Sequence, residues 1–279
     1  METGLTSIGR NEDKMRFCNI ASGSSGNCTY VGDDNTHLIV DAGISGKRIE
    51  AGLNDLELTT SDVSGVLITH EHTDHIGGLP ILARKYGIPV FASGGTIEAI
   101  KKIPKFDNIP DHLFHPIVPE KSFSIGDFEI LPVPISHDAA EPVAYRIENN
   151  GKKAAIVTDL GTYDSRIVEY MKGCSILMLE ANHDVRMLEV GPYPYRLKRR
   201  ILGEKGHLSN DLCGRLLTEL ITDKLQQVIL GHLSKDNNLE ELAYETVRLE
   251  VTMADDNYRW GEFPVSIARR DMRTECVAV

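Results

Sequence analysis

The sequence lacks the features that mark several classes of protein. Its 279 residues contain no uninterrupted apolar run near the roughly 18 residues that a membrane span needs. The five cysteines are an odd number without a CxxC pair, which disfavours a disulfide framework and a zinc finger. The first residues, METGLTSIGRNEDK, hold no apolar stretch behind a basic start, so no secretory signal is expected. These absences favour a reducing, cytoplasmic setting without a membrane partner.

The composition is that of an ordinary globular protein with an acidic balance. Apolar residues make up 41% and charged residues 25%, which excludes a disordered, collagen-like or coiled-coil chain. The formal net charge of −11 still allows a local basic groove, because a field depends on where the charges lie. We find no internal repeat and no low-complexity linker. We therefore expect a disordered polar extension over residues 1–14 and a single domain over residues 15–279.

Short apolar runs alternate with helical patterns along the chain. Runs rich in Val, Ile and Leu predict strands at residues 17–21, 29–31, 38–41, 66–69, 90–92, 128–134, 143–147, 154–158, 176–180 and 228–231. Helices are predicted after the capping residues Asp164, Ser209 and Asn238, where apolar residues recur at helical spacing. Hairpin-like strands come first and strands alternating with helices come later. This order favours an α/β (α+β) fold of two sheets flanked by helices.

The densest set of potential metal ligands follows a predicted buried strand. The segment HEHTDH at residues 70–75 offers His70, His72, Asp74 and His75 within six residues. Imidazole and carboxylate suit Zn, Mn or Fe. A strand end would hold these groups firmly while the loop leaves one side open to substrate. Three of the ten histidines in one short window are too concentrated for a loop of unrelated solvated residues.

Four further ionisable residues each end an apolar run. They are Asp41, His137, Asp159 and His232. Each one alone would more often be a cap or a surface residue. A catalytic zinc ion needs three protein ligands and an open position, so these strand ends are the expected source of the missing ligands.

HEHTDH, with Asp41 before it and the other three residues after it, resembles the metallo-β-lactamase fold. The resemblance covers nearly the whole chain from Met15. It implies an αββα sandwich of two mixed sheets flanked by helices, with two divalent metal ions, Zn or Mn, in a cleft at the strand ends. It further implies that one ion is held by His70, His72 and His137, that the other is held by Asp74, His75 and His232, that Asp159 bridges them and that Asp41 orients a ligand histidine.

Such a pair of ions lowers the pKa of a shared water and stabilises both oxygens of a displacement, which is the chemistry of hydrolysis. The ligand motif alone leaves a lactam, a thioester, a lactone and a phosphodiester open as substrates. Three other segments narrow the choice. They are the loop SGSSGN (22–27), whose backbone N–H groups suit an anion, the strand end LEANHD (179–184) and the helix start GHLSN (206–210).

Together with YPYRLK (193–198) and GHLSKDNN (231–238), these segments resemble the YycJ/WalJ-type exonucleases and, more loosely, ribonuclease Z and ribonuclease J. The resemblance implies 5′→3′ degradation of DNA and a link to mismatch repair. The chain has no room for the large insert domain of ribonuclease J or for the extended arm of ribonuclease Z, which disfavours RNA processing.

Local charge supports a nucleic-acid substrate. Five cations lie within ten residues, interrupted by one acidic residue; they are Arg196, Lys198, Arg199, Arg200 and Lys205. Tyr193 and Tyr195 lie just upstream and could stack on bases. Phosphate contacts are usually made by such a patch, although a solvated helix face has the same pattern. The expected substrate-binding residues are Ser24, Ser25, Asn27, Arg196, Arg199, Arg200 and Ser234.

The residues and the resemblance together predict a dinuclear metal-dependent phosphodiesterase, a 5′→3′ exonuclease on DNA with a repair role. It would use a metal-bridged hydroxide and a proton donor formed by His207 and Glu180, with Asp74 as the third catalytic group. The alternatives are a thioester or lactone hydrolase of the same fold, an RNA-processing nuclease, and a non-catalytic metal-binding protein. The sequence leaves open Zn or Mn, monomer or homodimer, and the role of His183. His37, His112 and His115 are expected on the surface.

Overall fold

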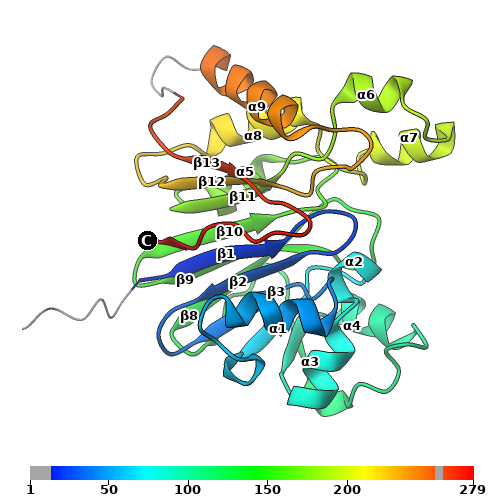
Figure 1. Ribbon diagram of the computed structural model, residues 1–279, viewed down its shortest axis with the longest axis vertical. Helices are drawn as coiled ribbons and strands as arrows, with labels where there is room; N and C mark the ends of the chain where they lie inside the picture. The colour runs from blue at the N-terminus through cyan, green and yellow to red at the C-terminus, as the bar shows by residue number, and fades with distance from the viewer. Residues whose placement is uncertain (1–13, 255–259) are drawn as a thin grey trace, which may run out of the picture.

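The computed structural model describes residues 14–254 and 260–279. The predicted extension over residues 1–14 therefore lies, apart from Lys14, outside the described residues. Within that part of the chain no helix has the length and apolarity to cross a bilayer. The described residues fold into two seven-stranded sheets with helices on their outer faces (Figure 1).

The first sheet has the strand order β14-β1-β2-β3-β4-β5-β6. Its strands are β1 (Arg16–Ala21), β2 (Cys28–Gly32), β3 (His37–Val40), β4 (Gly65–Leu67), β5 (Val90–Ser93), β6 (Phe114–Ile117) and β14 (Val277–Ala278). Pairing is antiparallel from β14 to β3 and parallel from β3 to β6. The sheet is therefore mixed, as predicted.

The second sheet repeats this plan in the order β13-β12-β11-β10-β9-β8-β7. Its strands are β7 (Phe123–Ile125), β8 (Phe128–Pro134), β9 (Val143–Asn149), β10 (Lys152–Val157), β11 (Ile176–Glu180), β12 (Gln227–Gly231) and β13 (Val265–Ile267). Pairing is antiparallel from β7 to β10 and parallel from β10 to β13. Each sheet thus has a parallel half whose strands all end at one edge.

Helices cover both outer faces (Figure 1). On the side of the first sheet lie α1 (Gly46–Asn54), α2 (Thr73–Ile76), α3 (Leu79–Tyr86) and α4 (Gly94–Lys101), with the short 3-10 turns η1 (Thr60–Asp62) and η2 (Asp111–Leu113). The second half of the chain adds α5 (Ser165–Met171), α6 (Val185–Val190), α7 (Tyr195–Ile201), α8 (Asn210–Leu220) and α9 (Glu240–Ala254).

Two of the three predicted helix caps are confirmed. The Asp164 side chain accepts hydrogen bonds from the first backbone N–H groups of α5, and Ser209 accepts one from Leu212 in α8. The prediction for Asn238 was wrong, because α9 begins at Glu240. The Asn238 amide instead bonds the Asn210 side chain at 2.9 Å and two backbone carbonyls beyond β11, so it joins three loops.

The strand faces alternate between two kinds of core. Phe17 of β1 packs between the sheets, whereas its neighbour Cys18 packs against the helices of the first sheet. This alternation follows from the period of two along a strand. Three apolar clusters result, one between the sheets and one beneath the helices on each side. The prediction that His37 lies on the surface was wrong. Its side chain is buried, and its Nδ1 lies 3.0 Å from the Tyr30 hydroxyl.

One hydrogen bond links the second sheet to the start of the metal motif. The hydroxyl of buried Tyr145 on β9 donates to the carbonyl of Ile68 at 2.8 Å. Tyr145→Phe should leave that carbonyl unpaired and cost about 1–2 kcal/mol of unfolding free energy, measurable by urea titration. Tyr163→Phe is the control, since its hydroxyl bonds Glu219 in an exposed position; equal losses in both variants would contradict the argument.

Candidate metal centre

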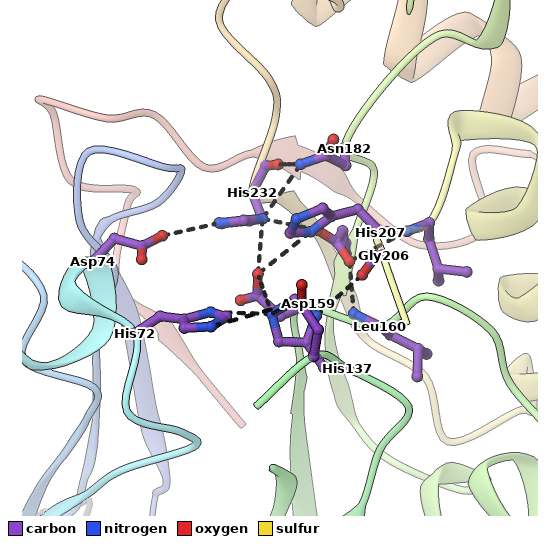
Figure 2. A network of polar contacts seen from close by, with 12 residues as sticks. His72, Asp74, His137, Asp159, Leu160, Asn182, Gly206, His207 and His232 are labelled. Carbon is purple, nitrogen blue, oxygen red and sulfur yellow. Dashed lines mark hydrogen bonds and ion pairs between the residues drawn. The ribbon is translucent and has the colours of Figure 1, made fainter. Parts of the chain in front are cut away.

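The parallel halves of the two sheets place the predicted ligands together. Ligand-bearing loops in α/β sheets gather at the carboxyl ends of parallel strands. Asp41 follows β3, Asp159 follows β10, and His232 follows β12. The HEHTDH segment follows β4, and its last residues form α2. Figure 2 shows His72, His137, His207 and His232, which come from separate elements, gathered around Asp159.

Three imidazoles form the first candidate ligand set. The Nδ1 atom of His72 lies 3.0 Å from Nε2 of His70 and 3.2 Å from Nε2 of His137. A tetrahedral ion with nitrogen ligands at about 2.0–2.1 Å separates those nitrogens by roughly 3.3 Å. The three nitrogens are therefore already spaced as the ligands of one ion, and they can hold a divalent metal.

Asp74, His75 and His232 form the second candidate set. Asp74 Oδ2 lies 3.7 Å from Nε2 of both histidines. The Asp159 carboxylate stands between the two sets, with Oδ2 at 2.9 Å from His75 Nε2 and Oδ1 at 3.8 Å from His137 Nε2. The structure thus brings together all seven predicted metal ligands, with Asp159 in the position of a bridge.

The electrostatics of the cluster favour a buried positive charge. Burial alone would raise the pKa of Asp159, but the facing imidazoles of His232 and His75 outweigh burial and hold that pKa well below its usual range. Burial would likewise lower the pKa of His75, yet Asp41 and Asp159 raise it well above its ordinary value. Within the described residues, the buried Nε2 of His232 has no hydrogen-bond partner. A divalent cation fits both the field and this free nitrogen.

Asp41 and Thr69 fix the orientation of two ligand histidines. Asp41 Oδ2 lies 2.7 Å from Nδ1 of His75, as the prediction for Asp41 requires. The Thr69 hydroxyl donates to the same carboxylate at 2.9 Å and lies 3.0 Å from Nδ1 of His70. Both rings therefore have Nδ1 engaged and Nε2 directed to the centre. Such outer contacts set the tautomer and position of metal ligands.

Three site residues have a backbone conformation that most residues avoid. Asp41, Asp159 and His232 have φ values of 59°, 57° and 55°. Aspartate and histidine tolerate this left-handed region better than most side chains, but it still costs about 1–3 kcal/mol each and is typical of functional sites. The sharp turn directs each side chain from its strand end into the centre.

A close backbone approach holds the SGSSGN loop against α2. The N–H of Asn27 donates to the carbonyl of Asp74 at 2.8 Å. Gly43 lies over the same carbonyl, where a Cβ atom would stand 1.6 Å from the Asp74 oxygen. Only glycine fits there. The Asn27 side chain, predicted to bind substrate, is buried with Nδ2 at 3.1 Å from Nε2 of His75.

Glu180 and His207 lie beside the second ligand set. Glu180 Oε1 lies 2.8 Å from Nδ1 of His207 and 2.8 Å from Nδ1 of His232. Burial would raise the pKa of Glu180, but His207 and then His232 lower it to about 2. Burial would lower the pKa of His207, but Glu180 raises it. The ring is therefore held protonated on Nδ1, while Nε2 stays outside this contact.

His183, whose role the sequence left open, lies buried beside the start of α8. Its side chain is 1% exposed, and burial lowers its pKa to about 4. Its carbonyl accepts a hydrogen bond from the N–H of Asn210, the first residue of α8. The preceding Asn182 donates from Nδ2 to the carbonyl of His232 at 2.9 Å. This pair of residues joins β11 to β12 and α8 behind the metal ligands.

The predicted substrate-binding residues lie in different places. Ser24 and Ser25 are exposed in the SGSSGN loop, and Arg196 and Arg199 are exposed on α7. Ser234 is half-buried just after His232, and its N–H donates to the Asn182 carbonyl at 2.7 Å. The structure brings Ser24, Ser25 and Ser234 to one cavity, whereas Asn27 and the arginines lie elsewhere.

Arg200 is not a free cation in this structure. Its Nε and Nη2 donate to Asp138 at 2.5 Å and 3.0 Å. Asp138 Oδ1 in turn lies 3.5 Å from Nε2 of His137. The pair therefore links α7 to the first ligand set. The pKa of Asp138 would rise with burial, but Arg200 and His137 lower it.

The sequence argument missed several residues that support the ligands. They are Ser22, Thr69, Glu71, Asp138 and Asn182. Glu71 lies within HEHTDH but accepts a hydrogen bond from the N–H of Ala140 at 2.8 Å, which fixes the loop after His137. Each makes its contact with a segment distant in sequence or through a turn. The places of Ser22, Thr69 and Asn182 at or beside strand ends are the signal that could have indicated these three.

Known proteins match this arrangement over most of the chain. A family model described as "Beta-lactamase superfamily domain" matches residues 36–232. Exodeoxyribonuclease YycJ of Bacillus anthracis is 46% identical over 235 residues, which cover 84% of this chain and 88% of that protein. The chain belongs to the beta-lactamase superfamily, in the family of YycJ. Exodeoxyribonuclease WalJ of Streptococcus pneumoniae is 38% identical over 86% of this chain and 90% of its own length.

Solved structures share the fold at low sequence identity. The metallo-beta-lactamase fold protein YhfI from Bacillus subtilis superposes with a TM-score of 0.69 at 16% identity, covering 94% of this chain and 99% of YhfI. The short form of human tRNase Z gives a TM-score of 0.64 at 16% identity, with 94% and 99% coverage. These likenesses confirm the predicted αββα sandwich.

Proposed function

We propose that this beta-lactamase superfamily member is a dinuclear metal-dependent phosphodiesterase that degrades DNA from the 5′ end. The observation that carries the proposal is the pair of ligand sets sharing Asp159, beside His207, an imidazole outside both sets. His70, His72 and His137 would hold one ion. The other ion would be held by Asp74, His75 and His232, with Asp159 bridging the two.

The chain's own residues determine how the site works. When bound, two divalent ions supply an activated water and neutralise charge on the phosphoryl oxygens. Thr69 and Asp41 engage Nδ1 of His70 and His75, which directs Nε2 of each ring to the centre. Asp74 is the one carboxylate of the second set that is partly open to solvent, with a side chain 23% exposed. It therefore faces the side from which substrate arrives.

His207 is the proposed proton donor to the leaving sugar oxygen. Glu180 holds its Nδ1 at 2.8 Å and raises its pKa. The Nε2 atom is then the nitrogen that can give a proton to a substrate. The His207 side chain is 16% exposed, which is enough for it to contact a bound substrate. A donor placed in this way contributes typically about 10²–10⁴-fold to a rate.

DNA is the favoured substrate because of the relatives to which the chain is similar. YycJ and WalJ, with 46% and 38% identity, are both named exodeoxyribonucleases. The exposed cations of α7 suit a nucleic acid. Hydrolysis of a thioester or a lactone would leave the Glu180–His207 pair without a role. A cytoplasmic location, the choice between Zn and Mn, and a homodimeric state stay predictions.

A substrate panel tests the proposed function. The protein is loaded with Mn or Zn and incubated with each substrate in parallel. The substrates are duplex DNA, single-stranded DNA, RNA of the same sequence, a thioester and a lactone. We expect rapid release of nucleotides from DNA and little turnover of the other substrates. Preferred turnover of the thioester, the lactone or RNA would contradict the proposal and favour the corresponding alternative.

The exposed arginines of α7 give a prediction about binding. Arg196→Ala with Arg199→Ala should weaken DNA binding and flatten the slope of log K against log salt by up to about 1.8, since each lost phosphate contact is worth about 0.9. Arg248→Ala is the matched control, because this exposed arginine on α9 is already paired with Glu245. A slope that is unchanged in the double variant would make α7 an ordinary solvated face.

A further inference from the structure

A cavity of about 710 Å³ adjoins the second ligand set, and its wall includes none of the α7 cations. Its wall includes Ser22 and Ser24 of the SGSSGN loop and Ser234 after β12. The Ser22 hydroxyl accepts a hydrogen bond from the N–H of His232 at 2.7 Å, so the cavity shares a wall with this candidate ligand. Its size lies in the range of pockets that take a small-molecule ligand.

Two half-buried arginines give this cavity its chemistry. Arg48 of α1 donates from Nη2 to the carbonyl of Arg270 at 2.5 Å, and Arg270 donates to the carbonyl of Leu233. Among the described residues, neither guanidinium has a carboxylate within 4.0 Å. Charges withdrawn from water are normally paired. Each guanidinium has five N–H donors, so most of its donors can bind an anion.

The position of Arg270 is fixed by its surroundings. Its side chain lies over Gly23, whose φ is +129°, and a Cβ atom at Gly23 would stand 3.2 Å from the Arg270 Nε atom. The same side chain reaches the carbonyl of Leu233, next to His232. Arg270 therefore bridges the SGSSGN loop and the loop after β12. A cation held in this way loses little conformational entropy when it binds a ligand.

The other charged groups of the cavity leave this preference intact. Arg269 and Glu240 neutralise each other through bonds of 2.8–3.1 Å. Asp236 accepts a hydrogen bond from the Tyr193 hydroxyl at 2.8 Å. Asp271 is exposed and so is Lys235, which offsets it. The half-buried charge of the cavity is therefore that of Arg48 and Arg270.

We infer that this cavity binds the terminal 5′-phosphate of the strand being degraded and so selects a strand end. This inference rests on the proposed function. A terminal phosphate carries a charge of about −1.5 to −2 at pH 7, more than the single charge of a phosphodiester. It therefore gains more from two converging guanidiniums. Ser24, Ser25 and Ser234 offer hydroxyl groups on the same wall.

The test compares strand ends rather than overall activity. Four duplexes of one sequence carry a 5′-phosphate, a 5′-hydroxyl, a 3′-phosphate or a 3′-hydroxyl end, and kcat/KM is measured with metal-loaded protein. We expect the 5′-phosphate to be preferred over the 5′-hydroxyl by about 10-fold, as charge-assisted hydrogen bonds imply. Arg48→Gln and Arg270→Gln should reduce that ratio to about one through a higher KM on the 5′-phosphate alone.

The 5′-hydroxyl substrate reports whether each variant is folded, because it does not use the arginines. Arg269→Ala is the matched control from the same wall, and its ratio should equal that of the wild type. Should Arg270→Gln lose activity on every substrate, Arg48→Gln still decides the matter. Equal rates on phosphate and hydroxyl ends, a preference for a 3′-phosphate, or a ratio retained in Arg48→Gln would overturn the inference. Failure to hydrolyse any DNA would instead overturn the proposed function.

Discussion

His72→Ala and Asp74→Ala are each expected to abolish DNA hydrolysis and to lower the bound metal. Each substitution removes one ligand from a set of three, which leaves the ion without a complete site. His72 Nδ1 lies within 3.2 Å of both other nitrogens of its set, so its loss opens the first set at its centre. Metal per chain, measured by elemental analysis, and the rate of nucleotide release together check this result.

Glu71→Gln is the matched control for this pair. Glu71 lies between the ligands in sequence, yet its Oε1 bonds the N–H of Ala140 at 2.8 Å. The amide oxygen of glutamine can accept the same hydrogen bond, so metal content and activity should remain close to those of the wild type. Full activity in a chelator-treated, metal-free preparation would contradict the metal-dependent account.

His207→Ala is expected to keep both metals and to bind DNA while losing about 10²–10⁴-fold in turnover. The departing sugar oxygen of DNA needs a proton, and His207 is the proposed donor. A p-nitrophenolate leaving group departs without a proton, so hydrolysis of a p-nitrophenyl phosphodiester should be much less affected. The comparison of the two substrates separates proton donation from a general loss of structure.

Glu180 acts in this scheme as a positioning residue, because it holds Nδ1 of His207. The same carboxylate oxygen lies 2.8 Å from Nδ1 of His232. Glu180→Gln should move the basic limb of the pH profile for DNA to lower pH, since the pKa of His207 would no longer be raised. If His207→Ala lost metal, or lost activity equally on both substrates, His207 would be a ligand or a structural residue instead.

The sequence predicted the inner strands of both sheets and missed the four at the edges. All ten predicted strands are present. The missed strands, β6, β7, β13 and β14, are the outermost strand at each end of the two sheets. Edge strands are short and half-exposed, and β6 also contains Pro116, which edge positions tolerate. Their apolar signal is weak because only one side of each strand is paired.

The candidate ligands could be predicted because each directly follows an apolar run. That local pattern, together with the rule that parallel strands end at one edge, placed residues from Asp41 to His232 in one centre. The contacts that organise the centre have no such local pattern. Glu180 meets His232 only because β11 and β12 are neighbours, and Arg200 meets Asp138 across 62 residues of chain. Such contacts depend on tertiary packing, which spacing along the chain does not encode.

The most direct test of the central claim follows the two ends of one DNA strand. Duplex DNA labelled at the 5′ end or at the 3′ end is incubated with metal-loaded protein, and the size of the first labelled product is measured. The account predicts that the 5′ label leaves first as a short nucleotide product while the 3′ label stays in slowly shortening strands, and that a chelator stops both. Early release of the 3′ label, internal cleavage of both strands, or no release with Mn or Zn would contradict it.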